Sequence, residues 1–241
     1  MPSKIRLYFS KELKANLLSY LSNEQSHYIK NVMRLKPGDT IALFNSMNGE
    51  WSAKIVNHNK ENTEFKVEKL IKTRKLENDI WLAFSPIKKS PLDIMIQKAT
   101  ELGIQKFIPI LSERTIVKEI NTERLKKIII EASEQSNRIS VPEIKNLESL
   151  KNFLDKFPKE GSLIFCDINC DQSDLKNILS KKKLGPVCIL IGPEGDFSEE
   201  ERQLIIEKKE IFSLSLANNI LRAETAAIAA VTIVNYHLNF S

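Results

Sequence analysis

The fold is decided by the stretch VCILIGPEGDFSEEERQLIIEKKEIFSLSLANNILRAETAAIAAVTIVNY, residues 187–236. It opens with an apolar run, Val187–Ile191, which is bounded by Gly-Pro pairs and predicts a buried strand. The loop Gly192–Asp196 contains two glycines that accept φ > 0 and let a ligand approach the backbone. Ser198 and Glu201 form a capping box, which predicts a helix directly after the loop.

The charges around this loop argue against a phosphate ligand. The loop carries Glu194 and Asp196, and the first helical turn holds Glu199–Glu201. No lysine or arginine follows until Arg202, so carboxylates already offset the positive helix end that would attract a phosphate. A ligand that is neutral in its nucleoside part or positive at its reactive centre, such as a sulfonium cofactor, fits better than a nucleoside triphosphate. The alternative is a tight strand-to-helix turn that binds no ligand.

A second strand is predicted over residues 211–216, and it leads into the loop LANNILRAETA, residues 216–226. In this loop an apolar Ile220-Leu221 pair precedes Arg222 at the start of the last helix, which is an unusual helix entrance. If the two strands are neighbours in a parallel sheet, both loops lie at the carboxyl ends of the strands. They would then form a pocket together.

The excess positive charge is confined to the N-terminal part of the chain. Residues 1–74 contain 13 Lys+Arg and 7 Asp+Glu (+6), and residues 75–241 contain 23 and 24 (−1), which together give the net charge of +5. We therefore predict two domains, residues 1–72 and residues 73–241, of which the first binds a polyanion. The alternative explanation of the charge is a lysine-rich solvated surface.

The first domain is predicted to consist mostly of strands. Short β-type runs cover residues 5–9, 40–44, 50–56 and 63–67. Asn48-Gly49 is a strong hairpin signal between the second and third runs. We expect a small barrel, with a helix over residues 23–33 that Ser22 caps.

The second domain is predicted to alternate strands and helices. Strands are expected over residues 80–84, 106–111 and 163–166, and helices over residues 90–103, 121–137 and 174–180, the first of them opened by Ser90-Pro91. This alternation predicts an α/β fold with a parallel sheet that is covered on both faces. The last helix, Ala223–Tyr236, is apolar almost all round, so we expect a second chain to cover its outer face.

Composition excludes several classes of protein. No apolar run reaches transmembrane length and the first residues begin no signal peptide, so we expect a cytoplasmic protein with no membrane partner. The three cysteines belong to no CxxC motif and indicate thiols in a reducing compartment: Cys166, Cys170 and Cys188. The three histidines are widely separated in the sequence, so we expect no metal site: His27, His58 and His237.

Five blocks of the sequence form a recognisable set. They are HYIKNVMRLKPGD (27–39), KATELGIQKFIPILSERT (98–115), EASEQSNRISVPEI (131–144), IGPEGDFSEEE (191–201) and LANNILRAETA (216–226). In this order they resemble the ribosomal RNA small subunit methyltransferase E family, whose members methylate N3 of one uridine in small-subunit ribosomal RNA. That family belongs to the SPOUT superfamily. Two residues depart from the family pattern, since Asp196 and Ala217 stand where glycines are usual.

The resemblance implies S-adenosyl-L-methionine as the cofactor and 16S ribosomal RNA, within the small subunit, as the partner. It implies a PUA-like RNA-binding barrel followed by a SPOUT domain with a deep trefoil knot, paired into a homodimer through the last helix. Cofactor-binding residues are expected in the two loops: Leu190, Ile191, Gly192, Pro193, Gly195, Leu216, Ala217, Asn219, Ile220, Leu221 and Thr225. RNA-binding residues are expected at Arg6, His27, Arg34, Lys36, Lys88, Arg114 and Arg138.

Methylation of uridine N3 sets a chemical requirement. N3 is a weakly acidic imide nitrogen, so its proton must be removed or the developing anion must be stabilised. Arg222 is the candidate catalytic residue, because its guanidinium can stabilise the uracil anion through O4 or O2. The alternative role of Arg222 is an ion pair with Glu224 or Glu194, and the alternative for Lys88 is a plain solvated lysine.

The expected function is therefore S-adenosylmethionine-dependent methylation of N3 of a uridine in 16S ribosomal RNA. One alternative is another knotted methyltransferase that acts on transfer RNA or on a ribose 2′-OH. The other is a non-enzymatic RNA-binding ribosome assembly factor that has lost cofactor binding, for which Asp196 and Ala217 are the signs.

Overall fold

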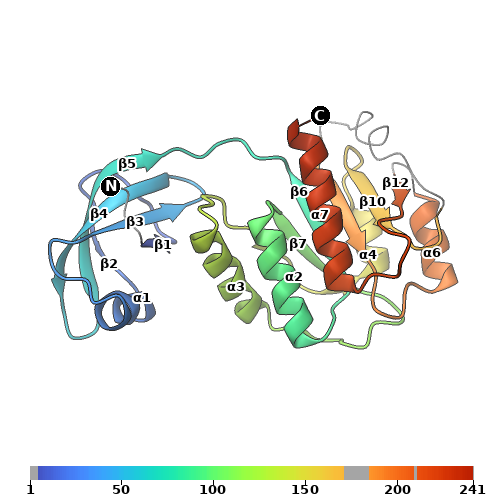
Figure 1. Ribbon diagram of the computed structural model, residues 1–241, viewed down its shortest axis with the longest axis horizontal. Helices are drawn as coiled ribbons and strands as arrows, with labels where there is room; N and C mark the ends of the chain where they lie inside the picture. The colour runs from blue at the N-terminus through green and yellow to red at the C-terminus, as the bar shows by residue number, and fades with distance from the viewer. Residues whose placement is uncertain (1–4, 171–184, 209–210, 241) are drawn as a thin grey trace. The chain divides into compact units, whose positions relative to one another are not determined.

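The computed structural model describes residues 5–170, 185–208 and 211–240 (Figure 1). The chain divides into two compact units. Unit 1 comprises the residues up to Leu76 together with Ser133–Val141, and unit 2 comprises Glu77–Ala132 and the residues from Pro142 onwards. Ser133–Val141, which the sequence analysis assigned to the second domain, thus groups with the N-terminal residues.

Unit 1 is built on a five-stranded sheet. In spatial order its strands are β1 (Arg6–Tyr8), β3 (Thr40–Asn45), β4 (Gly49–His58), β5 (Thr63–Lys72) and β2 (Leu18–Tyr20). Neighbouring strands are antiparallel except for β1 and β3. Their inward residues form one core that includes Leu7, Leu43, Ile55, Phe65 and Val67. The strand pairs of the described residues leave β1 and β2 as the ends of the sheet.

The hairpin predicted at Asn48-Gly49 is confirmed. β3 and β4 pair antiparallel, with Asn45 opposite Gly49. Gly49 has a φ of +83°, and a Cβ on it would overlap the carbonyl oxygen of Lys72. A side chain is therefore excluded at Gly49 both by conformation and by space.

The predicted N-cap of the first helix is also confirmed. Ser22 Oγ accepts the N–H of Gln25 at 3.2 Å, and the Gln25 side chain accepts the N–H of Ser22 at 3.3 Å. α1 (Asn23–His27) is nevertheless short, because it continues as a π-helical turn over Tyr28–Val32. The sequence predicted one regular helix to Met33, whose N–H instead donates to the carbonyl of Tyr28 at 2.9 Å.

Unit 2 is an α/β unit around a parallel sheet, as predicted. In spatial order its strands are β12 (Ile211–Leu214), β10 (Ser162–Cys166), β11 (Val187–Ile191), β6 (Ile80–Phe84), β7 (Lys106–Leu111) and β8 (Glu143–Ile144). A further strand, β9 (Glu148–Ser149), pairs with the carboxyl end of β7. Every one of these pairs is parallel, so the strands end at the same edge of the sheet.

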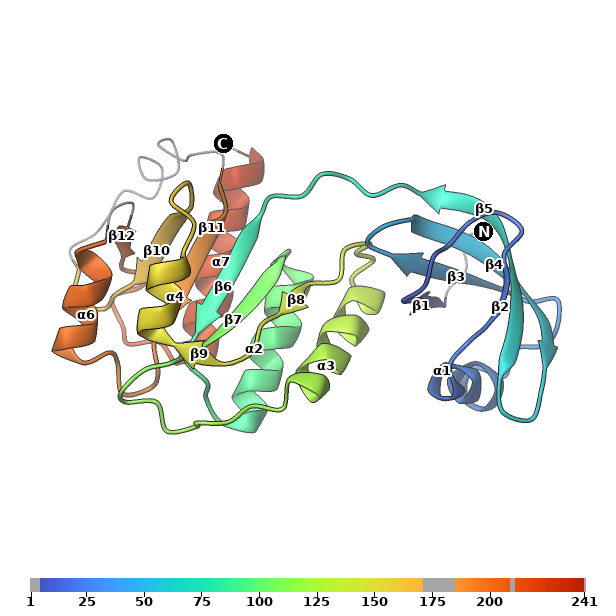
Figure 2. The same ribbon diagram turned by 180° about the vertical axis from the view of Figure 1, so that it is seen from behind.

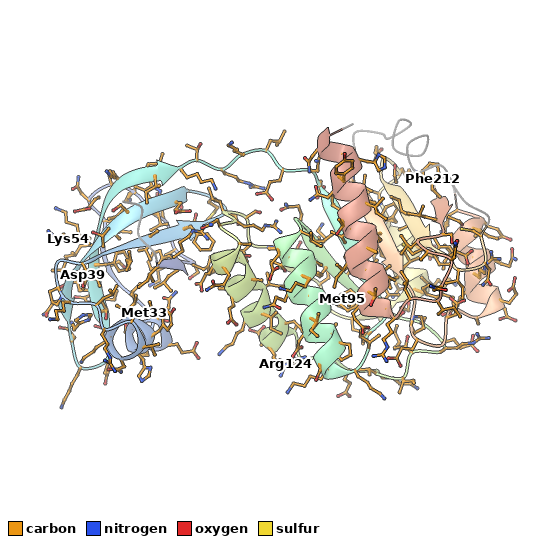
Figure 3. The ribbon with its side chains drawn as sticks, viewed as in Figure 1. Met33, Asp39, Lys54, Met95, Arg124 and Phe212 are labelled. Atoms are coloured by element: carbon orange, nitrogen blue, oxygen red, sulfur yellow. The ribbon has the colours of Figure 1, made fainter. Side chains whose placement is uncertain are left out.

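Helices cover both faces of this sheet (Figures 1 and 2). α2 (Lys89–Glu101) and α7 (Ala223–Phe240) pack together on one face, where Met95 of α2 is fully buried (Figure 3). α4 (Leu150–Lys156) and α6 (Glu199–Ile206) lie on the other face, over a core that includes Phe153, Leu163, Phe165, Cys188 and Leu190. α3 (Thr122–Gln135) follows β7 in the chain.

The start of α2 differs from the prediction. Lys88 is its N-cap and Pro91 its third residue, whereas Ser90-Pro91 was expected to open the helix. Proline is tolerated there because the first N–H groups of a helix lack intrahelical acceptors. The helix ends as predicted at Gly103, which has a φ of +105°. Asn235 of α7 donates to the carbonyl of Leu102 at 2.6 Å and so ties this end to α7.

Several short elements are absent from the sequence predictions. β2, β8 and β9 have three residues or fewer, which is too short for a recognisable period. α4 also escaped prediction, although Ser149 caps it by accepting the N–H of Asn152 at 3.2 Å. The helix expected over residues 174–180 lies outside the described residues. Among the described helices, none combines the length and apolarity needed to cross a membrane.

Candidate active site

A cavity of about 510 Å³ opens at the carboxyl edge of the sheet in unit 2. Its walls come from the ends of β10 and β11 and from the segments that follow β6, β10, β11 and β12. They are formed by Lys88, Pro91, Cys166, Ile168, Ile191, Gly192, Pro193, Glu194, Asp196, Ile220, Leu221, Arg222, Ala223, Glu224 and Ala226. Ligands of parallel α/β sheets bind at this edge, and the volume lies within the range of small-molecule sites.

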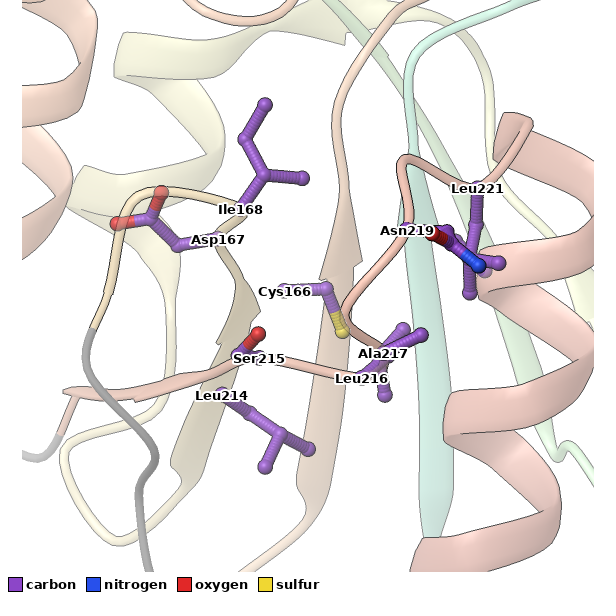
Figure 4. Close-up of a pocket in the computed structure, with 10 residues that line it drawn as sticks. Cys166, Asp167, Ile168, Leu214, Ser215, Leu216, Ala217, Asn219 and Leu221 are labelled. Atoms are coloured by element: carbon purple, nitrogen blue, oxygen red, sulfur yellow. The ribbon is translucent and has the colours of Figure 1, made fainter.

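A smaller cavity of about 40 Å³ adjoins the first one. The two share four lining residues: Cys166, Ile168, Leu221 and Ala226. The remaining wall of the small cavity is formed by Asp167, by residues 214–217 at the end of β12 and by Asn219. Figure 4 shows the Cys166 sulfur directed toward the turn at Leu216 and Ala217. The two predicted loops therefore meet around one site.

The loop after β11 is shaped by Phe197. A Cβ on Gly192 would lie 2.9 Å from Phe197 Cε2, so this glycine is required for space. The buried Phe197 ring packs edge-on against Phe165, with 5.6 Å between the centroids. Neither glycine of the loop uses its freedom to take φ > 0, and the positive φ of +59° falls on Asp196. Asp196 tolerates it because Oδ1 accepts the N–H of Phe197 at 2.8 Å.

Hydrogen bonds connect this loop to the segment after β7. The predicted capping box is present, with Ser198 Oγ accepting the N–H of Glu201 at 3.3 Å. The same Glu201 side chain accepts the N–H of Glu113 at 2.8 Å. Arg114 donates to the carbonyl of Gly195 at 3.2 Å. The glycine loop is thus supported from two sides.

A chain of buried hydroxyl groups joins the segments that follow β6 and β7, and a main-chain hydrogen bond connects it to the end of β11. Ser85 Oγ lies 3.1 Å from Ser112 Oγ, which in turn lies 2.7 Å from Thr115 Oγ1. The N–H of Ser85 donates to the carbonyl of Ile191 at 3.1 Å. All three hydroxyl residues are buried. The chain fixes the segment after β6, which carries Lys88, next to the glycine loop.

A buried ion pair supports the β10 side of the site. Asp167 Oδ2 accepts from Arg202 Nε at 3.1 Å and from Nη2 at 2.8 Å. The side chain of Asp167 is 1% exposed and that of Arg202 is 24% exposed. The hydrogen bond to Asp167 raises the pKa of Arg202 above its already high value, so Arg202 stays protonated. The N–H of Asp167 donates to the carbonyl of Leu214 at 3.2 Å, which joins the ends of β10 and β12.

Cys166 is a partly buried wall of both cavities. Burial raises the pKa of its thiol well above the ordinary value, and the neighbouring Cys170 adds to the rise. Because the thiolate is the reactive form of cysteine, the neutral Cys166 contributes a polarizable, apolar surface.

Charges of both signs line the large cavity. Lys88 and Arg222 are the cations, and Glu194, Asp196 and Glu224 are the carboxylates. Arg222 is exposed and its guanidinium forms no ion pair with any residue that the structure describes. The alternative role of Arg222, pairing with Glu224 or Glu194, is therefore not observed. Its donors are available to a ligand.

Comparison with known proteins identifies the family to which the chain belongs. Residues 74–235 match the model of an RNA methyltransferase domain, and residues 21–68 match that of an RNA methyltransferase PUA domain. Ribosomal RNA small subunit methyltransferase E of Rickettsia conorii is 34% identical over 228 residues, which cover 94% of this chain and 93% of that protein. The chain belongs to the ribosomal RNA small subunit methyltransferase E family.

Other family members agree over nearly the whole length. The Bacillus subtilis protein of the same name is 28% identical, covering 90% of this chain and 89% of that protein. The Neisseria gonorrhoeae enzyme, solved with bound S-adenosyl methionine, superimposes with a TM-score of 0.86 at 29% identity, over 98% of this chain and 99% of that one. A methyltransferase from Legionella pneumophila, also solved with this cofactor, gives a TM-score of 0.84 at 29% identity, over 95% and 96% of the two chains.

Most of the predicted cofactor-binding residues lie at the two cavities. Those that line one or both are Ile191, Gly192, Pro193, Leu216, Ala217, Asn219, Ile220 and Leu221. Leu190 does not, because alternation along β11 directs it into the core beneath α4 and α6. Gly195 and Thr225 lie outside the linings as well. Ala217 is exposed and has no positive φ, so the alanine fits where the family usually has glycine.

Arg6 is a buried structural residue, which corrects its predicted role in RNA binding. Its side chain is 8% exposed and forms an ion pair with Glu50 at 2.8 Å. Its remaining donors bond to three main-chain carbonyls at 2.8–3.1 Å, those of Ser133, Glu134 and Arg138. Arg6 therefore holds Ser133–Val141 to β1 within unit 1, and has no donor left for phosphate.

The other predicted RNA-binding residues divide by exposure. Arg138 is buried and donates to Ser140 Oγ at 2.8 Å, so it shapes unit 1 instead of holding a phosphate. The exposed residues are His27, Arg34 and Lys36 in unit 1 and Lys88 and Arg114 in unit 2. Lys88 lines the large cavity, which favours a site role over a plain solvated lysine.

Sequence reasoning missed the third wall of the site, Cys166–Ile168. The strand ending at Cys166 was predicted, and in a parallel sheet the segment after each strand is a candidate for the site. The spatial neighbours of β10 were not predictable, however, because residues 167–186 separate it from β11.

Among the described residues, no cluster of three or more His, Cys, Asp or Glu side chains suits a metal ion.

Proposed function

We propose that this chain uses S-adenosyl-L-methionine to methylate N3 of one uridine in 16S ribosomal RNA. The observation that carries the proposal is the meeting of IGPEGD and LANNILRAE around one cavity of about 510 Å³. Family membership and two neighbours solved with S-adenosylmethionine support the choice of cofactor. The name of the family supports small-subunit ribosomal RNA as the substrate.

The site fits this cofactor on chemical grounds. Gly192, Pro193 and the apolar pair Ile220-Leu221 offer backbone groups and apolar surface to a nucleoside. Glu194, Asp196 and Glu224 favour a group with positive charge at the same cavity, and they disfavour phosphate. When bound, the cofactor supplies an electrophilic methyl group on a sulfonium centre.

We propose Arg222 as the catalytic residue that stabilises the uracil anion. It lies directly before α7, on the wall of the cavity, and its guanidinium is not engaged by another described side chain. Two parallel donors suit O4 or O2 of an imide that is losing its N3 proton. Lys88, on the opposite segment after β6, adds positive charge for the substrate phosphate or for the same anion.

Unit 1 is proposed to hold the RNA. His27, Arg34 and Lys36 are its exposed candidate contacts, and the match to a PUA domain supports this assignment. The proposal includes closure of its sheet into a PUA-like barrel, a trefoil knot in unit 2 and a homodimer through α7. Ile233 and Tyr236 of α7 support the dimer, because these large hydrophobic side chains are 36% and 61% exposed and a second chain could cover them. Sedimentation at several concentrations tests the dimer.

Two measurements test the proposed function. Isothermal calorimetry with S-adenosylmethionine should show saturable binding; no heat at millimolar cofactor would end the enzyme proposal. Nucleoside mass spectrometry of small subunits and of free 16S RNA, each treated with protein and cofactor, should then detect 3-methyluridine. Methylation of ribose, or of transfer RNA in a parallel reaction, would replace the proposed substrate with one of the other two.

A further inference from the structure

Residues 27–36 of unit 1 form an exposed surface that the packing of the unit does not require. Ile29 is the one fully buried side chain of this segment, and Leu35 packs partly against the same core. Three large side chains are exposed instead, Tyr28 with 38%, Val32 with 58% and Met33 with 38% of their surface accessible. We call residues 27–36 the turn surface.

The turn surface is held in a fixed and unusual conformation. It contains the π-helical turn Tyr28–Val32, and the N–H of Leu35 reaches back to the carbonyl of Ile29 at 3.0 Å. Arg34 has a φ of +55°, which is uncommon for a residue with a long side chain. His58 of β4 supports the segment, because its Nε2 donates to the carbonyl of Leu35 at 2.9 Å. Irregular helical turns of this kind are frequent at functional sites.

The charge of the turn surface is entirely positive. Lys30, Arg34 and Lys36 are exposed, His27 is exposed beside them, and the segment contains no carboxylate. Asp39, which follows the segment, caps it by accepting the N–H of Lys36 at 2.7 Å. An aromatic ring among cations suits a polyanion that also has flat apolar groups, which describes unpaired RNA. A lipid surface or an acidic protein would be attracted to the cations but would not stack on the single aromatic ring.

We propose that the turn surface is a stacking platform for an unpaired nucleotide of the RNA substrate. The Tyr28 ring stacks on the base, Val32 and Met33 extend the apolar contact, and Lys30, Arg34 and Lys36 hold the flanking phosphates. The proposal rests on the RNA substrate of the proposed function and adds a preference for single-stranded over duplex RNA, because paired bases do not expose their faces.

The chain offers a matched control in Tyr20. It is 49% exposed in the same unit, but its hydroxyl donates to Glu64 at 3.2 Å, and the negative charge of Glu64 raises the pKa of Tyr20. This carboxylate repels RNA. Tyr20→Ala should therefore leave RNA binding unchanged, whereas Tyr28→Ala should weaken it.

The experiment compares binding of full-length variants to a labelled single-stranded oligouridylate and to a duplex RNA of equal length. Tyr28→Ala should weaken single-strand binding roughly 5- to 100-fold, the scale of losing one stacked base, and should change duplex binding by less than about two-fold. Tyr28→Phe should retain single-strand affinity. Equal losses on both RNAs, or a Tyr28→Ala protein that binds the oligouridylate like the wild type, would overturn the proposal.

Arg34→Gly separates RNA binding from folding. Glycine accepts the φ of Arg34 without strain, so the melting temperature should stay at or above that of the wild type. The variant should nevertheless bind the oligouridylate more weakly, with a salt dependence reduced by about 0.7 in the logarithmic slope for one lost phosphate contact. An unchanged slope in both Arg34→Gly and Lys30→Gln would contradict the platform.

Failure of the platform and failure of the proposed function remain distinguishable. Cofactor binding by calorimetry depends on unit 2, so it should be the same in the wild type and in the Tyr28 and Arg34 variants. A wild type that binds oligouridylate through Tyr28 but does not bind S-adenosylmethionine would refute the enzyme and keep the platform. Normal methylation of 16S RNA by Tyr28→Ala at limiting RNA concentration would refute the platform and keep the enzyme.

Discussion

Arg202→Ala should destabilise unit 2 far more than Asp167→Asn, although both substitutions break the same ion pair. The Asp167 side chain is 1% exposed, whereas the Arg202 side chain is 24% exposed. Without Arg202, the N–H of Asn169, 2.9 Å from Oδ1, is the one donor to the buried carboxylate that remains among the described residues. Removing one partner of a buried pair costs about 3–5 kcal/mol, and the partial exposure of Arg202 puts the expected cost near 3 kcal/mol.

Asp167→Asn leaves a different situation. The cation that loses its partner reaches water, and the amide oxygen of asparagine can still accept one hydrogen bond from Arg202. The expected cost is therefore about 1 kcal/mol. The double variant should be less destabilised than the sum of the two single variants by about 0.5–3 kcal/mol. Once Asp167 is replaced by asparagine, Arg202→Ala no longer leaves a buried carboxylate without its cation.

Urea unfolding of unit 2 measures these differences. Trp51 lies in unit 1 and Trp81 in unit 2, so a Trp51→Phe background makes the fluorescence report on unit 2 alone. Lys208→Ala is the control, since Lys208 pairs with Asp155 at 3.0 Å with both side chains exposed, and should cost less than about 1 kcal/mol. If Arg202→Ala costs no more than Lys208→Ala, or no more than Asp167→Asn, the reasoning from burial is refuted.

Three further outcomes are expected. Arg222→Ala should lower the rate of 16S RNA methylation about 100-fold or more, with cofactor affinity and melting temperature nearly unchanged; a wild-type rate would remove it as the anion stabiliser. Gly192→Ala should cost about 1–3 kcal/mol of stability and weaken cofactor binding by calorimetry, since its Cβ would lie 2.9 Å from Phe197 Cε2. Burial raises the pKa of the Cys166 and Cys188 thiols above 9.0, so above about pH 9 these thiols ionise more readily in the unfolded chain than in the folded one. The free energy of unfolding should therefore be intact below pH 9 and fall above it, by up to about 1.4 kcal/mol per pH unit for each thiol. In urea unfolding, a Cys166→Ser, Cys188→Ala variant should lose less stability than the wild type between pH 8 and 10.

The sequence predicted the second unit well because its signals are local. The apolar run Val187–Ile191 and the capping box of Ser198 each specify an element within a few residues. The parallel sheet followed from their alternation. What escaped was long-range: Asp167 meets Arg202 across 35 residues, and no local pattern indicates that pairing.

The glycine loop shows that one residue type can be required for different physical reasons. The sequence indicated that both glycines can take φ > 0, whereas Gly192 is needed for the close approach of Phe197 and the positive φ belongs to Asp196. A departure from the family pattern at Asp196 had suggested weakened cofactor binding. Asp196 Oδ1 accepts the N–H of the next residue, Phe197, so the aspartate stabilises the turn that it occupies.

Arginines were the least predictable of the candidate residues, and Arg6 shows why this matters for dividing the chain. From sequence, Arg6 in a basic module suggests phosphate, but its guanidinium bonds to the carbonyls of Ser133, Glu134 and Arg138. The N–H of Tyr8 likewise donates to the Glu134 carboxylate at 2.9 Å. Deleting residues 1–72 would therefore remove the donors that Arg6 and Tyr8 supply to Ser133–Val141. A loss of RNA affinity in such a fragment would mix unfolding with the loss of contacts. Substitutions of the exposed residues of the turn surface, such as Tyr28 and Lys30, isolate the contribution of unit 1 to RNA binding.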